Sequence, residues 1–223
     1  LISTVMETAR EIIQELKKTQ EVKRIETAGS LRRMNETIRD IDLLVVSKKP
    51  EQTTNFFAKL STRILAKGPT KTTIILKQGL QADLRIVEEK NFGAAWQYFT
   101  GSKDHNIHLR QTALKKGYKL SEYGLFKKNK FICGKTEKEI YNKLGFEWIP
   151  PELREDKGEL TIKKLPKIVP YNSIKGDMQT HTKWSDGNNS IKEMAEKCEK
   201  TGYEYIAITD HSKSQHIAKG MTE

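Results

Sequence analysis

The sequence places two carboxylates at the start of a strand that is otherwise apolar. Asp40 and Asp42 open the segment Asp40–Ser47, which reads DIDLLVVS. Successive side chains of a strand point to opposite faces, so these two carboxylates share one face and lie about 7 Å apart. Two like charges this close repel each other and lose hydration, and a strand tolerates them if they share a divalent cation. The segment therefore predicts a strand that begins at a cation site.

A third carboxylate lies inside another apolar segment. Asp83 belongs to the segment Leu80–Val87, which we expect to be a strand. If this strand is a neighbour of Asp40–Ser47, three carboxylates converge and offer the hard oxygen ligands that suit Mg²⁺. Two such ions, about 3.5–4 Å apart, would clamp the attacking and leaving oxygens of a phosphoryl displacement. The alternative is a solvent-facing Asp pair to which Asp83 is unrelated.

A short polar turn precedes the carboxylate pair by about ten residues. Gly29 and Ser30 follow a strand that we predict over Val22–Thr27, and Arg33 comes three residues later. Glycine allows the backbone to approach a phosphate closely, and the Ser30 hydroxyl and the Arg33 guanidinium are suitable donors to it. A phosphate-binding turn next to a metal-binding pair is the arrangement that a nucleoside triphosphate requires.

The remaining patterns predict a mixed α+β domain. Apolar residues recur at helical spacing from Ile2 to Leu16 and again from Phe56 to Ile64. Strands over Lys71–Lys77 and Leu80–Val87 are joined at a short hairpin connection, and the pattern is helical again from Phe92 to Gly117. Strands followed by helices, with a hairpin connection, favour the α+β class.

Three runs resemble the family X DNA polymerases, within the wider nucleotidyltransferase superfamily. The run GSLRRMNETIRDIDLLV from Gly29 is similar to the family's GS-x-RR…D-x-D signature. A second run, AAWQYFTGSKDHNIHLRQTALKKGYKLSEYGLF from Ala94, resembles its YFTGS segment and the helix after it. A third, GFEWIPPELRE from Gly145, resembles the end of its thumb. The resemblance implies a nucleotidyltransferase-type palm with a mixed β-sheet over residues 1–100 and a small α+β thumb over 101–150.

The same resemblance implies roles for the residues of the first run. Asp40 and Asp42 would bind both metal ions, and Asp83 would bind the catalytic ion and help to deprotonate the primer 3′-hydroxyl. The ions would be Mg²⁺, with Mn²⁺ as an alternative. Gln81 stands where some members carry an arginine that would support Asp83 with positive charge, and this sequence departs from the family there. The residues that would hold the triphosphate are Gly29, Ser30 and Arg33.

In the second run the resemblance assigns the rest of the substrate site. Tyr98 and Phe99 would lie beside the incoming sugar and help to exclude a 2′-hydroxyl. Asn106 would contact the base in the minor groove, and Arg110 would contact the template strand. The turn that completes the nucleotide site would be formed by Gly101 and Ser102.

A polar stretch over 151–175, with several prolines, predicts a linker, and a new block begins at residue 176. Residues 176–223 resemble the truncated N-terminal part of a PHP (β/α) domain, which accompanies bacterial and archaeal members of the polymerase family. His181, Asp186 and His211 match metal-ligand positions there, and Zn²⁺ or Mn²⁺ would suit a complete site. Gln179 stands in place of the usual first histidine and is a poor substitute ligand.

The distribution of charge indicates a polyanionic partner. The net charge is +11, and residues 1–100 contribute +5, residues 101–150 contribute +6, and residues 151–223 contribute none. A basic field of this kind attracts nucleic acid in a salt-dependent way, although a lysine-rich solvated surface is the alternative explanation. Together with the resemblance, it predicts gapped primer–template DNA and deoxynucleoside triphosphates as partners, and the reaction would be DNA-directed DNA synthesis in short-gap repair.

Composition bears on the setting of the protein. No apolar run approaches the roughly 18 residues that span a bilayer, and the first turn already has the pattern of an amphipathic helix. Cys133 and Cys198 are far apart, as expected of reduced thiols in a cytoplasmic protein. Because the first residue is Leu1, we expect a piece of a longer chain. Two other functions stay open: a PHP-type phosphoesterase or 3′→5′ exonuclease, and an inactive DNA-binding fragment.

Overall fold

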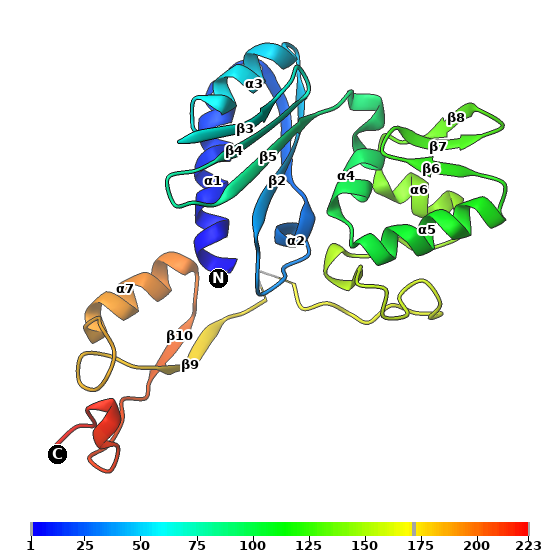
Figure 1. The fold of residues 1–223 in the computed structure, drawn as a ribbon. Coiled ribbons are helices and arrows are strands. Elements are labelled where there is room, and N and C mark those ends of the chain that lie inside the picture. Colours follow the sequence, from blue (N-terminus) through cyan, green and yellow to red (C-terminus); the bar gives the residue numbers. More distant parts are fainter. Residues whose placement is uncertain (1, 171–172, 223) are drawn as a thin grey trace. The chain divides into compact units, whose positions relative to one another are not determined.

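A computed structural model describes residues 2–170 and 173–222, and the chain divides after Leu165 into two compact units (Figure 1). The first unit holds a five-stranded sheet and, farther along the chain, a three-stranded sheet with its own helices. Its first half consists of α1 (Ile2–Lys18), β1 (Val22–Thr27), α2 (Gly29–Arg32), β2 (Asp40–Ser47), α3 (Pro50–Ala58), β3 (Arg63–Lys67), β4 (Lys71–Ile75) and β5 (Gln81–Ile86).

The five-stranded sheet has the order β1-β2-β5-β4-β3. Strands β2 and β5 are parallel, whereas every other neighbouring pair is antiparallel, so the sheet is mixed as the sequence predicts. The central strand β2 is apolar throughout because both of its faces are covered. Leu43 and Val45 pack into the core below α1 and α3, and Leu44 and Val46 pack against the helix that follows the sheet.

This alternation decides where the carboxylates of β2 point. Asp40 and Asp42 share their face with Leu44 and Val46, since residues two apart in a strand lie on one side. That face is the one on which α4 packs, through Phe92 and Ala95. The carboxylates are therefore directed to the side of the sheet where the second half of the unit lies.

The second half of the first unit is a smaller α+β region that surrounds a separate core. Helix α4 ends at Thr100, and α5 begins at Lys103 after a cis peptide bond between Gly101 and Ser102. In Figure 1 the three-stranded sheet lies on the far side of α4 from the five-stranded sheet. The elements are η1 (Glu89–Asn91), α4 (Phe92–Thr100), α5 (Lys103–Lys115), β6 (Lys119–Ser121), β7 (Gly124–Lys127), β8 (Lys130–Cys133), α6 (Glu137–Lys143) and η2 (Pro151–Leu153).

Three expectations from the sequence need correction. The segment that begins at Gly29 is a single helical turn, α2, rather than an open turn. Helix α3 ends at Ala58. Ile64 belongs instead to the edge strand β3, because the backbone there pairs with β4 and places Ile64 opposite Ile74. The expected linker over 151–175 begins too early, since Leu160 is buried in the second core and the first unit extends to Leu165.

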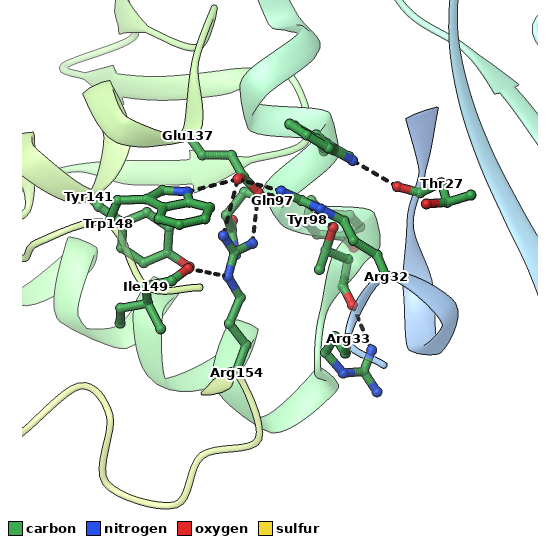
Figure 2. Close-up of polar contacts among 12 residues, drawn as sticks. Thr27, Arg32, Arg33, Gln97, Tyr98, Glu137, Tyr141, Trp148, Ile149 and Arg154 are labelled. Atoms are coloured by element: carbon green, nitrogen blue, oxygen red, sulfur yellow. Dashed lines mark hydrogen bonds and ion pairs between the residues drawn. The ribbon is translucent and has the colours of Figure 1, made fainter. Parts of the chain in front are cut away.

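A buried carboxylate connects the two halves of the first unit (Figure 2). Glu137, at the start of α6, accepts hydrogen bonds of 2.7 and 2.8 Å from the guanidinium of Arg32 in α2. It also accepts bonds of 2.7 and 3.1 Å from Arg154 and one of 2.9 Å from the indole of Trp148. Arg32 in addition lies 3.4 Å above the ring of Trp96 in α4. Glu137 therefore joins α2, which lies 105 positions earlier in the chain, to the segment of Trp148 and Arg154.

The ionisation of Glu137 is strongly favoured by these partners. Burial acts to raise its pKa, but the hydrogen bonds and charges of Arg32 and Arg154 outweigh burial and lower the pKa from 4.5 to about 2. Arg154 is itself fully buried and also donates to the carbonyl of Ile149 at 2.9 Å. Removal of the carboxylate would leave two buried guanidinium groups without their counter-charge.

The second unit is small and begins after Leu165. Its strands β9 (Gly176–Thr180) and β10 (Tyr205–Ile208) are parallel, and they are connected through α7 (Ile191–Thr201), which begins with a capping box at Ser190. A short turn, η3 (His216–Ala218), follows β10. Within the described parts of both units, no helix has the length and apolar character that a bilayer crossing requires.

We expect the stability of the first unit to depend on the charge of Glu137. The folded pKa is lower than that of an unfolded glutamate, so the stabilisation is complete above about pH 4.5 and is lost as the pH falls toward about 2. At pH 7, Glu137→Gln should lower the unfolding free energy by about 3–5 kcal/mol. Between about pH 4.5 and about pH 2, the unfolding free energy of this variant should depend less on pH than that of the wild type. Urea unfolding at a series of pH values measures both. The exposed Glu147→Gln serves as the control, and an equal loss in that variant would contradict the assignment.

Candidate active site

The three carboxylates predicted from the sequence lie at one end of the β2–β5 pair. In the parallel register Asp42 is directly opposite Asp83, and Asp40 is opposite Gln81. Burial, followed by the charges of Asp40 and Asp83, raises the pKa of Asp42 to about 7. The charges of Arg33 and Arg85 act in the other direction but do not outweigh burial and the two neighbouring carboxylates. The hard oxygen donors of the three carboxylates fit a divalent cation such as Mg²⁺ or Mn²⁺.

Neutral donors, rather than an arginine, hold the carboxylate of Asp83. The side-chain amide of Gln81 donates to one of its oxygens at 2.6 Å, and the hydroxyl of Thr73 on the neighbouring strand β4 donates to the other. These bonds fix the direction of the carboxylate without neutralising it. The departure at Gln81 thus leaves Asp83 oriented and available as a metal ligand or a proton acceptor.

The expected phosphate turn is built against Asp42. Gly29 has a φ of +58°, and a Cβ atom at this position would overlap a carboxylate oxygen of Asp42. Only glycine meets both conditions, because the left-handed conformation costs an L residue about 1–2 kcal/mol. The close approach brings Ser30, the next residue of α2, to the edge of the carboxylate cluster. Gly29 and Ser30 both line a cleft of about 390 Å³ together with Asp40 and Asp42.

Arg33 reaches the same cleft and is held there by two acceptors. Its Nη1 donates to the carbonyl of Thr100 at 2.6 Å, and its Nε donates to Glu155 at 2.6 Å. Arg33 lines the cleft, and only 12% of its side chain is exposed. Arg32, the preceding residue, points away to Glu137. The two adjacent arginines therefore have separate tasks, one in the core of the unit and one in the cleft.

The aromatic pair of the second run forms a wall of this cleft. The rings of Tyr98 and Phe99 meet edge to face with their centroids 5.1 Å apart, and the guanidinium of Arg85 lies 4.3 Å from the centre of Phe99. After Gly101, Ser102 begins α5 and its hydroxyl accepts from the backbone N–H of the residue three positions later. The two rings therefore limit the size of a ligand that can lie in the cleft beside Gly29 and Ser30.

Asn106 and Arg110 also line the cleft, but the amide of Asn106 has partners within the protein. Its oxygen accepts from Gln97 at 2.6 Å, and its nitrogen donates to the carbonyl of Tyr98 at 2.7 Å. The side chain thus fixes the end of α4, and one amide hydrogen remains for a substrate. Arg110 lies 5.9 Å from the ring centre of Tyr98. Contact of either residue with a base or a template strand stays a prediction.

The second unit brings its three expected ligands together. The ligand atoms of His181, Asp186 and His211 all lie within 4.8 Å of one another. His181 Nδ1 is 2.8 Å from one oxygen of Asp186, and His211 Nε2 is 3.8 Å from the other. Imidazole and carboxylate groups at this separation suit Zn²⁺ or Mn²⁺. The backbone N–H of Gln179, the weak fourth candidate, donates to Asp177 at 3.0 Å.

Several residues of these sites carried no signal that sequence patterns could reveal. Asp210 accepts from the backbone and hydroxyl of Thr182 and from Ser185, with bonds of 2.6 and 2.7 Å, and so fixes the loop between His181 and Asp186. Other residues likewise form hydrogen bonds with the predicted site residues: Thr73 with Asp83, Gln97 with Asn106 and Glu155 with Arg33.

The five-stranded sheet, the carboxylates on β2 and β5 and the adjoining phosphate turn define a nucleotidyltransferase-type protein. A family model for the DNA polymerase beta thumb matches residues 95–155, and a model for the PHP domain matches residues 177–222. The Repair DNA polymerase X of African swine fever virus (strain Badajoz 1971 Vero-adapted) is 33% identical over 144 residues, which are 59% of this chain and 82% of the viral protein. The chain belongs to the family of DNA polymerase X.

Two further similarities agree with this assignment. The DNA polymerase/3'-5' exonuclease PolX of Bacillus subtilis is 38% identical over 228 aligned residues. The alignment covers 99% of this chain, and the chain spans 40% of the length of that relative. The fold of Leishmania infantum polymerase beta in its ternary P/T complex matches with a TM-score of 0.63 at 22% identity. That match covers 69% of this chain and 76% of the other.

Glycine at position 29 should be essential for cation binding. We expect Gly29→Ala to weaken Mn²⁺ binding at the Asp40–Asp42–Asp83 cluster about 10- to 100-fold, because the new methyl group displaces the Asp42 carboxylate. Gly79→Ala is a matched control: its φ is +77°, and a Cβ there meets no atom within 4 Å. Mn²⁺ titration followed by electron paramagnetic resonance gives the affinities. Equal weakening in the two variants would mean that backbone strain alone is responsible.

Proposed function

We propose that this chain carries the catalytic region of a DNA-directed DNA polymerase that acts in DNA repair. The observation that carries the proposal is the cleft of Gly29, Ser30, Arg33 and the Asp40–Asp42 pair, opposite Asp83. The reaction is transfer of a deoxynucleoside monophosphate from its triphosphate to a primer 3′-hydroxyl, with release of pyrophosphate. Gapped primer–template DNA and deoxynucleoside triphosphates are the proposed partners. A cytoplasmic setting stays a prediction.

The roles of the residues follow from their chemistry. Asp40 and Asp42 would hold two divalent ions, Mg²⁺ or Mn²⁺, and Asp83 would join them at one of the ions, where bound metal neutralises charge on the attacking and leaving oxygens. One oxygen of Asp83 accepts the proton of the 3′-hydroxyl as the new P–O bond forms and the bond to pyrophosphate breaks. Gly29, Ser30 and Arg33 bind the departing phosphates.

The walls of the cleft would position the nucleoside. Tyr98 and Phe99 stand beside the phosphate turn, where a sugar would lie, and a 2′-hydroxyl would meet their rings. Gly101 and Ser102 turn the chain at this point so that Asn106 and Arg110 line the next part of the cleft.

We expect Asp83→Asn to abolish nucleotide addition while most of the affinity for the metal–nucleotide complex remains. Asp83 serves the attacking hydroxyl, whereas Asp40, Asp42 and Arg33 hold the triphosphate. Loss of a positioned proton acceptor typically costs about 10²–10⁴ in rate. Pyrophosphate release on gapped DNA and nucleotide titration measure the two properties, and the exposed Asp104→Asn is the control. Extension at the wild-type rate by the Asp83 variant would remove this residue from the mechanism.

The cluster of His181, Asp186 and His211 favours a second candidate function, metal-dependent phosphoesterase or 3′→5′ exonuclease activity in the second unit. Three ligands can hold one ion, whereas a multinuclear site needs more. We expect one Mn²⁺ site that is lost in His181→Ala and kept in His216→Ala, in addition to any ion at the Asp40–Asp42–Asp83 cluster, and no digestion of single-stranded DNA. Digestion that requires His181 would refute that expectation. Pyrophosphate release separates the polymerase from both this activity and an inactive DNA-binding protein.

A further inference from the structure

One face of the three-stranded sheet β6–β7–β8 is open and carries a row of aromatic and basic side chains. Lys119 in β6 is opposite Phe126 in β7, and Phe126 is opposite Phe131 in β8, so the three share a face. The other face is the inner one, where Leu120 and Leu125 are buried in the core. Phe131 keeps 47% of its surface exposed.

The ring of Phe131 is fixed in place by the residues below and beside it. A Cβ atom at Gly124 would lie 2.6 Å from this ring, and one at Gly134 would lie 3.2 Å from it, so the ring rests on two glycines. Phe126 meets it edge to face at 5.7 Å between centroids. An aromatic surface that is already ordered loses little entropy when a ligand stacks on it.

Positive charge accompanies this aromatic face. Lys119 shares the face with Phe126, and Lys128 lies in the turn between β7 and β8. Both are exposed, and neither has an ion-pair partner among the described residues. Lys127 and Lys130 are opposite each other in the strand register and belong to the other face. The segment from residue 115 to residue 135 contains seven lysines and a single acidic residue, Glu122. Unpaired cations beside flat apolar rings form a surface that is complementary to a chain of phosphates and bases.

We propose that this face binds single-stranded DNA, with a base stacked on Phe131 and phosphates bound by Lys119 and by Lys128 in the β7–β8 turn. Aromatic rings on a sheet can stack with unpaired bases, whereas the faces of paired bases are covered by their neighbours in a duplex. None of these residues lines the cleft around Asp40 and Asp42. The surface is therefore separate from the polymerase site. The proposal that this surface binds single-stranded DNA is independent of the proposed polymerase function. Only the identification of that DNA as the unpaired template strand rests on the proposed function.

The experiment compares variants of Phe131 in the whole chain. Fluorescence anisotropy gives the affinity for two primer–templates, one with a single unpaired template nucleotide and one with about 12, a length within the range of known single-strand sites. Phe131→Leu keeps an apolar side chain and loses the aromatic face, so we expect about 5-fold or greater weakening on the long overhang and no change on the short one. Phe131→Tyr keeps the ring and should bind as the wild type does.

A charge-reversal pair gives a second readout. Lys119→Glu/Lys128→Glu should weaken binding of labelled oligo(dT) and reduce the slope of log affinity against log salt by about 0.7 for each lost contact. Lys197→Glu/Lys200→Glu, on α7 in the second unit, is the matched control. Wild-type affinity in Phe131→Leu, equal weakening on both overhangs, or an unchanged salt slope would each overturn the proposal. Binding of oligo(dT) does not require catalysis. The result of this experiment can therefore be distinguished from a failure of the proposed nucleotide addition, which is measured by pyrophosphate release.

Discussion

The carboxylate of Glu137 is the contact on which the geometry of the cleft depends. It is buried between the guanidinium groups of Arg32 and Arg154, so the phosphate turn, the end of α4 and the segment around Trp148 are tied to one point. Arg32 and Arg33 are consecutive. When Arg32 is fixed in the core, the backbone of α2 is fixed as well, and Arg33 can reach only the cleft. A buried ion pair contributes little net stability, but loss of one member is costly. Its main effect here is therefore to specify one arrangement.

The active site uses the opposite electrostatic arrangement. Around Glu137 each charge has a counter-charge, and the pKa of the carboxyl group falls to about 2. Around Asp42 three carboxylates lie close together, and burial with the charges of Asp40 and Asp83 raises the pKa of Asp42 to about 7. The first arrangement has its counter-charges within the protein, whereas in the proposed function the second would receive them from divalent cations. The same short stretch of chain, from Gly29 to Asp42, takes part in both.

The local elements of the site could be predicted from the sequence because their signals are local. The alternation in DIDLLVVS fixes which face bears the carboxylates, and a GS pair after a strand marks a phosphate turn. The partners of Arg32 and Arg33 could not be predicted, since Glu137 and Glu155 follow them by 105 and 122 positions. The strands β6–β8 are only three or four residues long, too short for a clear alternation. The polar composition after Pro151 concealed the buried Leu160.

The coupling between Arg32 and Glu137 tests this account most directly. The rate of nucleotide addition to gapped DNA should be measured for Arg32→Gln, Glu137→Gln and the double variant, at a temperature where circular dichroism shows all of them folded. If the pair holds the phosphate turn in place, each single variant is slower than the wild type, and the double variant is no slower than Glu137→Gln alone. Losses that simply add, or single variants that keep the wild-type rate, would contradict the claim that this contact sets the geometry of the cleft.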